Sequence, residues 1–204
     1  MRPPTTTGVA AGGGERETRC RETRCPERSG ALGSRLMNDA RTDPPFIADE
    51  RTMLNNWLDW HRQTLAVKCQ GLSAPQLRER SAPPSPMSLL GLVRHMAHVE
   101  HMWFRVVLNG EECRSPVKTP DNPDGDFLDV DAASPEEAFA LWRAEIGHAR
   151  EVSEGLPLDA VGKAQRHGED CSYRWILVHM IEEYARHNGH ADLIRERIDG
   201  ATGE

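Results

Sequence analysis

Near the C-terminus, a glutamate and a histidine occupy positions where a helix in a bundle should present apolar residues. Residues at spacings of three and four form one stripe, which reads Ile176, Met180, Glu183, His187, Ala191 and Ile194. A carboxylate in a helical core is costly unless it is paired or bound to a cation. Because Glu183 and His187 are four residues apart, both can reach one ion from adjacent turns. The pair therefore predicts a metal site.

A second histidine-rich helix offers a third ligand. It contains His95, His98 and His101. His95 is at helical spacing from the apolar residues Leu92 and Val99, whereas the other two histidines share a face with arginines. That pattern favours His95 as the ligand and predicts that His98 and His101 lie on or near a solvated face.

Two histidines and one glutamate are typical of a catalytic zinc centre that keeps a position for water or substrate. Nickel, iron and manganese accept the same ligand types. The alternative is a set of unrelated histidines, with Glu183 and Arg186 as solvent-exposed partners. Spacing and periodicity leave these two interpretations about equally favoured.

Four amphipathic segments must position these residues. Apolar periodicity and capping signals predict helices over about 46–69, 88–108, 134–155 and 173–198. We therefore expect an all-α four-helix bundle with a long crossover loop between helices 2 and 3. The DNPDGD string at 121–126 lacks the ligand spacing of a calcium-binding EF-hand loop, so it is interpreted as a cluster of turns.

The remaining chain divides simply. Residues 1–44 are rich in Gly, Thr, Arg and Pro and are expected to be a disordered tail, with Met37 as an alternative translation start. The bundle is expected over 45–200 and a short C-terminal tail over 201–204. Five cysteines at scattered spacings give no disulfide framework, so they are interpreted as structural or incidental thiols.

Charge and hydropathy exclude several classes of function. The formal net charge is -7 and Lys and Arg form no sustained run, so nucleic-acid binding and attraction to anionic membranes are not expected. No stretch is apolar enough to span a bilayer, and the N-terminus lacks the pattern of a secretory signal. A cytoplasmic location is expected.

Two segments, SLLGLVRHMAHVEHMWFRVVLNG (88–110) and RWILVHMIEEYARHNGHADLIRERIDG (174–200), resemble the DinB/YfiT-like superfamily of metal-binding four-helix bundles. The resemblance covers about 46–200 and is nearest to an actinobacterial branch that includes mini-circle proteins. It implies one metal ligand from the second helix and two from the fourth. Mycothiol-dependent maleylpyruvate isomerases show a His, Glu, His pattern that matches His95, Glu183 and His187, with an aromatic, here Trp103, eight residues after the first ligand.

Related members are thiol S-transferases, so the resemblance implies an enzyme that uses mycothiol or a similar low-molecular-weight thiol. The metal would bind the thiol as thiolate, which would attack an electrophilic small molecule in detoxification or a stress response. His179, His98 and His190 are the candidates for proton transfer. Arg186 and Arg174 are candidates for binding a carboxylate on the thiol or the substrate, with surface ion pairs as the alternative.

Two further functions stay open. A thiol-dependent isomerase of the maleylpyruvate type would release the thiol after it had added to an unsaturated acid. A non-enzymatic metal-binding or interaction module would have four protein ligands, and His61 on the apolar face of the first helix is the residue that could close such a site. A homodimer formed through an exposed helix face is compatible with each function.

Overall fold

The computed structural model describes residues 41–202, in which every regular element is helical. The long helices are α1 (Glu50–Cys69), α3 (Leu89–Glu100) with its π-helical continuation η1 (His101–Leu108), α5 (Pro135–Ser153) and α6 (Tyr173–Asp199). The short ones are α2 (Ala74–Arg78), α4 (Gly125–Leu128) and the 3-10 turn η2 (Asp129–Asp131). The expected all-α bundle is confirmed. The predictions for residues 1–40, including the alternative start at Met37, lie outside the described residues.

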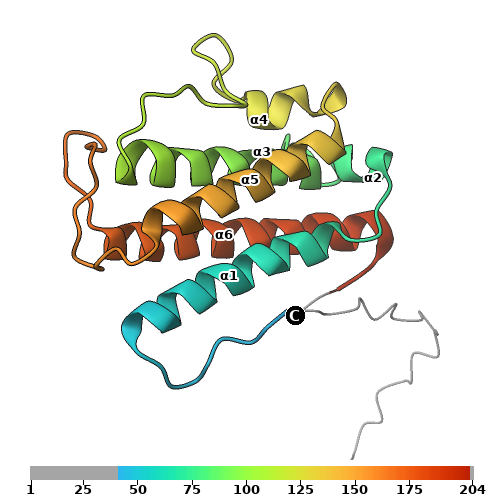
Figure 1. Ribbon diagram of the computed structural model, residues 1–204. Helices are drawn as coiled ribbons and strands as arrows, with labels where there is room; N and C mark the ends of the chain where they lie inside the picture. Colours follow the sequence, from blue (N-terminus) through green and yellow to red (C-terminus); the bar gives the residue numbers. More distant parts are fainter. Residues whose placement is uncertain (1–40, 203–204) are drawn as a thin grey trace, which may run out of the picture. The chain divides into compact units, whose positions relative to one another are not determined.

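The direction of the helices follows from one long connection. Helices α1 and α6 run side by side in the same direction, and α3 and α5 run together in the opposite direction (Figure 1). The chain between Leu108 and Pro135 therefore crosses back along the bundle, carrying α4 and η2 over α3. This is the crossover loop expected between the second and third long helices. No helix among residues 41–202 combines the length and apolar character that a bilayer span requires.

Side-chain caps fix where the helices begin. Asp49 accepts a hydrogen bond from the backbone N–H of Thr52 at the start of α1, and Ser172 accepts one from Trp175 at the start of α6. Helix α6 ends at Gly200, whose φ of 76° is left-handed. The first helix starts later than the expected residue 46, because Asp49 caps it and Phe46 is fully exposed.

The central helix α3 is buried on two faces, since it packs against both α5 and α6. His101 lies at helical spacing from Ala97 and Phe104, which are both buried, and is itself only 6% exposed. The prediction of a solvated face was therefore wrong for His101. Beyond Glu100 the helix widens into a π-helix, in which Asn109 N–H donates to the carbonyl of Phe104 five residues earlier.

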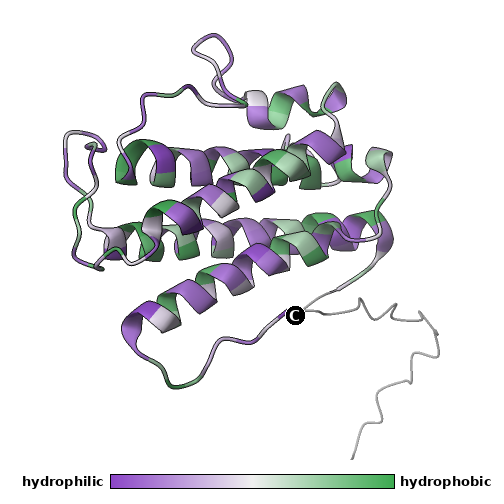
Figure 2. Cartoon of the chain, viewed as in Figure 1, coloured by the Kyte–Doolittle hydropathy of each residue, from purple (hydrophilic) through white to green (hydrophobic). Residues whose placement is uncertain are grey.

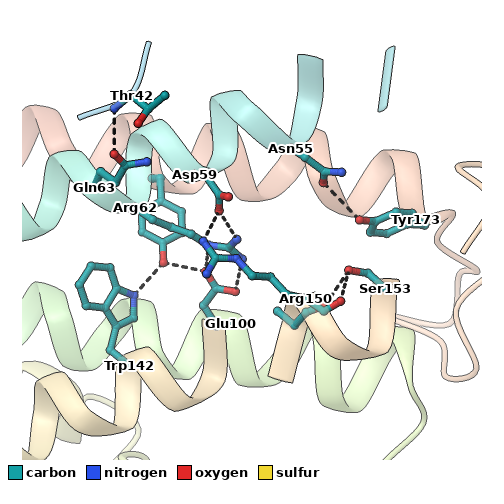
Figure 3. Close-up of polar contacts among 12 residues, drawn as sticks. Thr42, Asn55, Asp59, Arg62, Gln63, Glu100, Trp142, Arg150, Ser153 and Tyr173 are labelled. Atoms are coloured by element: carbon teal, nitrogen blue, oxygen red, sulfur yellow. Dashed lines mark hydrogen bonds and ion pairs between the residues drawn. The ribbon is translucent and has the colours of Figure 1, made fainter. Parts of the chain in front are cut away.

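A buried polar network joins all four long helices (Figure 3). Arg62 of α1 donates two hydrogen bonds, of 2.8 and 2.7 Å, to the two carboxylate oxygens of Glu100 on α3. Tyr184 of α6 donates to Glu100 at 2.7 Å, and Trp142 of α5 donates to the Tyr184 hydroxyl at 2.8 Å. Burial and the Glu100 charge raise the pKa of Tyr184, so its hydroxyl keeps its proton. The network fixes the four long helices relative to one another.

The long helices are amphipathic, as their positions in a bundle require. Figure 2 shows hydrophilic and hydrophobic residues alternating along each long helix. The side chains that fill the centre are mostly aliphatic, among them Leu65, Leu92, Met96, Ile176 and Met180, each 0% exposed. Tight packing of these residues holds α3 and α6 at a fixed separation, which positions the polar side chains that both helices carry.

Candidate metal centre

Three predicted ligands lie together between α3 and α6. His95, Glu183 and His187 each offer one ligand atom, and these atoms lie within 4.8 Å of one another. Nε2 of His187 is 3.5 Å from Oε2 of Glu183, and the His95 and His187 ring centroids are 4.6 Å apart. Ligand atoms around a tetrahedral zinc ion are about 3.4 Å apart, given bonds of about 2.1 Å. A small inward adjustment would therefore bring the three residues to a single ion.

An aspartate from the crossover loop orients His95. Oδ2 of Asp126 is 2.7 Å from Nδ1 of His95, and Nζ of Lys118 is 2.9 Å from the same oxygen. Asp126 is 0% exposed. A carboxylate only accepts here, so Nδ1 carries the proton and Nε2 keeps a free lone pair for a metal. The structure thus supplies the hydrogen-bonded carboxylate that commonly supports a histidine ligand.

Sequence reasoning missed Asp126. Residues 121–124 do form turns, but Gly125 and Asp126 begin the short helix α4, and the Asp126 side chain is buried in the bundle. The approach depends on Gly125, where an added Cβ would lie 2.7 Å from the carbonyl oxygen of Val117. A glycine directly before an aspartate was the available signal, although it does not identify His95 as the partner.

Both carboxylates of the site favour the charged form. The hydrogen bond with His187 is the main cause that lowers the pKa of Glu183, and nearby His179 and His95 contribute, against the opposing effect of burial. Burial raises the pKa of Asp126, but the hydrogen bonds with His95 and Lys118 outweigh it and lower the pKa overall. Two carboxylates that favour the ionised form provide negative charge that suits a divalent cation.

A cavity of about 900 Å³ opens beside the ligand group, and His95 and Glu183 line it. Its other walls come from η1, from the crossover loop and from the segment 161–172 that precedes α6. The volume is that of a small-molecule site. A molecule in this cavity would therefore have direct access to the candidate ligands.

Aromatic rings and His179 form one wall of the cavity. The His179 ring stacks on Trp175 at a centroid distance of 5.1 Å and meets Trp103 edge-on at 4.5 Å. Nε2 of His179 is 3.4 Å from Oε1 of Glu183. The guanidinium of Arg166 lies over Trp103, 6.0 Å from its centroid. His179 is therefore placed between an apolar wall and the candidate metal ligands, where it can exchange a proton with a bound molecule.

The two other proton-transfer candidates differ in position. His98 lines the cavity, and its Nδ1 is 2.9 Å from the Ser115 hydroxyl. Burial, with the charge of Lys118, lowers the pKa of His98 to about 4, so His98 is neutral at neutral pH. His190 lies outside the cavity lining, and its Nδ1 is 3.4 Å from Nδ1 of His187. Burial also lowers the pKa of His190.

The two arginines predicted to bind a carboxylate lie elsewhere. Arg174 is half-buried and pairs with Glu50 at 2.7 Å, and Arg186 is exposed and pairs with Glu182. Neither residue lines the cavity. The cations that do line it are Arg166 and Lys118.

His61 is also placed away from the ligand group. Asn188 donates to the His61 carbonyl at 3.0 Å, and burial lowers the pKa of the His61 ring. Within residues 41–202, only one further cluster has metal-ligand spacing, formed by His179, Glu182 and Glu183. His61 belongs to neither cluster, so no fourth histidine closes the first one.

The fold and this cluster define a class of protein, a helical bundle with two histidines and a glutamate clustered beside a cavity. The family model described as mycothiol S-transferase matches residues 53–200. The chain therefore belongs to the mycothiol S-transferase family. No curated protein and no solved structure matches the chain.

Proposed function

We propose that this protein is a metal-dependent S-transferase that joins mycothiol to electrophilic small molecules. Membership of the mycothiol S-transferase family supports the thiol and the reaction class. The observation that carries the metal dependence is the convergence of His95, Glu183 and His187 within 4.8 Å, where two of them line a cavity of about 900 Å³.

The donor set suits a divalent metal, zinc above all. Two imidazoles and one carboxylate make a three-ligand site that keeps at least one position for substrate. Nickel, iron and manganese can bind the same donor types, which discriminate poorly among these metals. When bound, such an ion would hold the sulfur of the thiol as thiolate, its nucleophilic form.

The residues around the ligands prepare them for this task. Asp126 fixes the tautomer of His95 through Nδ1, so Nε2 faces the other ligands. Lys118 balances the buried charge of Asp126. His190, beside the Nδ1 atom of His187, supports the second histidine in the same way.

We propose that His179 accepts the proton of the incoming thiol. Its Nε2 lies 3.4 Å from Glu183 and its ring faces the cavity, so it can accept that proton while the sulfur enters the site. His98 is neutral at neutral pH and lines the same cavity. It can therefore donate a hydrogen bond to the electrophile or accept one from it.

The indole rings of Trp103 and Trp175 provide flat apolar faces against which a substrate can pack. The buried Trp103 ring also excludes water from part of the cavity, which would preserve the reactivity of the thiolate. The product would be a thioether of mycothiol, as in the removal of toxic electrophiles. We place this reaction in detoxification or a stress response in the cytoplasm.

A conjugation assay tests the proposal. The full chain, loaded with zinc, is mixed with mycothiol and monobromobimane, and the thioether is measured by mass spectrometry. We expect adduct formation well above the uncatalysed rate, its loss with a chelator, and its return with zinc. His179→Gln should slow the reaction at saturating zinc, whereas Arg174→Gln, remote from the cavity, should not.

Two results would contradict the proposal. An uncatalysed rate from a fully zinc-loaded protein, with a range of electrophiles, would exclude S-transfer while leaving the metal centre intact. Recovery of free mycothiol with an isomerised unsaturated acid would instead assign the protein to thiol-dependent isomerisation.

A further inference from the structure

A second cluster of reactive side chains lies away from the candidate metal centre. It contains Cys113 from the crossover loop, His101 at the start of η1 and Glu145 on α5. Nε2 of His101 is 3.3 Å from the Cys113 sulfur, and Nδ1 of the same ring is 3.6 Å from Oε1 of Glu145. None of the three lines the 900 Å³ cavity.

The imidazole of this cluster is buried between the Cys113 sulfur and the Glu145 carboxylate. His101 and Glu145 are each 6% exposed, whereas Cys113 is exposed. Nδ1 of His101 is buried without a hydrogen-bond partner, and the nearest carboxylate is that of Glu145. Arg105 donates to Glu145 at 2.7 Å and so fixes the carboxylate. The ring therefore directs Nε2 at an accessible sulfur.

The geometry is that of a proton relay and not of a metal chelate. The two ring nitrogens of His101 serve different partners, the sulfur on one side and the carboxylate on the other. A chelate needs one atom from each residue near a common point, and the clusters with that spacing in the described part of the chain do not include these residues. A thiol, an imidazole and a carboxylate in series are the arrangement that activates a nucleophile.

We propose that Cys113 is a nucleophilic thiol that exchanges with low-molecular-weight disulfides, with His101 as proton acceptor and Glu145 as positioning residue. The Cys113 proton passes to Nε2 of His101 while the sulfur attacks one sulfur of the disulfide. The disulfide bond breaks, a mixed disulfide forms on Cys113, and the leaving thiolate takes the proton from His101. The products are the S-thiolated protein and one small thiol, so atoms and electrons balance.

The surroundings of the sulfur explain why a base is needed. Partial burial is the main cause that raises the pKa of the Cys113 thiol; the charges of Glu111 and Glu145 also raise it, and that of Arg105 lowers it. The thiol is therefore protonated at neutral pH, and thiolate is the reactive form. Removal of the proton by His101 meets this requirement.

A disulfide suits the site better than an acyl substrate. Acyl transfer requires backbone donors that stabilise an oxyanion, but the N–H of Cys113 donates to the carbonyl of Glu111 at 3.2 Å. Thiol–disulfide exchange requires only a thiolate and access to it. The other cysteines among residues 41–202 are less suited, since Cys69 and Cys171 are buried and burial raises the pKa of each thiol, that of Cys69 to about 12.

The test uses the uncharged probe bis(2-hydroxyethyl) disulfide. The full chain carries Cys20→Ser and Cys25→Ser, so that only Cys69, Cys113 and Cys171 can react. Peptide mapping should place the mixed disulfide on Cys113. We expect His101→Gln to slow this modification at least tenfold and Glu145→Gln to slow it less. His148→Gln is the matched control, because that histidine contacts Glu111 and not the sulfur, and it should leave the rate unchanged.

The pH profile of the modification rate gives a readout that a merely structural role would not change. A thiol that reacts without a base gains about tenfold in rate per pH unit below its pKa. With His101 as the base, the rate should level off once that imidazole is neutral, and His101→Gln should restore the steep rise. A steep rise of the rate with pH in the protein that retains His101 would overturn the proposal. Modification of Cys69 or Cys171 before Cys113 would also overturn it. The measurement is made with a chelator present, so its outcome is independent of the metal centre.

Discussion

Nδ1 of His95 lies 2.7 Å from Oδ2 of Asp126, and this one hydrogen bond ties the crossover loop to the candidate metal centre. Asp126 is fully buried and held ionised, so it fixes the proton of His95 on Nδ1. The crossover, which sets the direction of α5, therefore also orients a candidate metal ligand. A change in the crossover loop is therefore expected to alter the candidate metal centre.

Asp126→Asn tests that relationship. The amide is a weaker acceptor than the carboxylate and leaves Lys118 without its partner, so we expect the affinity for zinc to fall about 10- to 100-fold. Competition with a chromophoric chelator measures this affinity. Asp121→Asn, in an exposed part of the same turn, is the control and should bind zinc as the native protein does. Equal affinities for the two variants would show that Asp126 does not support the ligand.

Glu100→Gln tests the buried network that joins the four long helices. The variant removes the buried carboxylate that pairs with the Arg62 guanidinium and leaves only the more exposed Asp59, at 2.9 Å, as its ionised partner, so we expect the free energy of unfolding to fall by about 2–3 kcal/mol. Urea unfolding followed by circular dichroism measures it. Glu196→Gln, on the exposed face of α6, should change stability by less than about 0.5 kcal/mol. A small loss for Glu100→Gln would mean that the network contributes little to stability.

His98 gives a prediction about pH. Its pKa is lowered from 6.5 to about 4 in the folded chain, so the unfolded chain binds more protons between these values. His98 therefore contributes stability above pH 6.5 that is lost as the pH falls toward 4. After allowance for partial exposure, the loss is about 2 kcal/mol.

The measurement compares the native protein with His98→Gln at several pH values, with a chelator present. Because the glutamine does not titrate, the native protein should lose stability relative to the variant as the pH falls from 7 to 4.5. Other groups titrate equally in both proteins and cancel. A difference in unfolding free energy that is constant across this range would show that the pKa of His98 is not lowered by folding.

The long helices were predictable because their signals are local. Ser134 and Pro135 mark the start of α5, and the stripe through Glu183 and His187 requires only the period of one helix. The choice of His95 over its neighbours also came from periodicity, and the structure places His95 beside the fourth-helix pair.

The rest depends on contacts between segments that are distant in sequence. Asp126 is 31 residues from His95, and the short helix α4, which begins at Gly125, brings the two together. His101 seemed solvated because a single amphipathic stripe was assumed, whereas α3 is covered on two sides. Periodicity describes one face of one helix and does not report which second element covers another face.

The most direct test of the metal centre compares Glu183→Gln with Glu182→Gln. Glu183 belongs to both possible ligand clusters, whereas Glu182 belongs only to the one with His179. Zinc binding is measured by titration calorimetry on the apo proteins, and the melting temperature is measured with and without zinc. Binding to the folded state raises the melting temperature by mass action, so the shift reports affinity.

We predict that the native protein and Glu182→Gln each bind one zinc ion with similar affinity and a similar rise in melting temperature. Glu183→Gln should bind at least tenfold more weakly, with a much smaller rise, while its apo form remains folded. Equal shifts for the native protein and Glu183→Gln would contradict the assigned ligand set. The absence of a shift in all three proteins, with no metal found on purification, would contradict the metal centre itself.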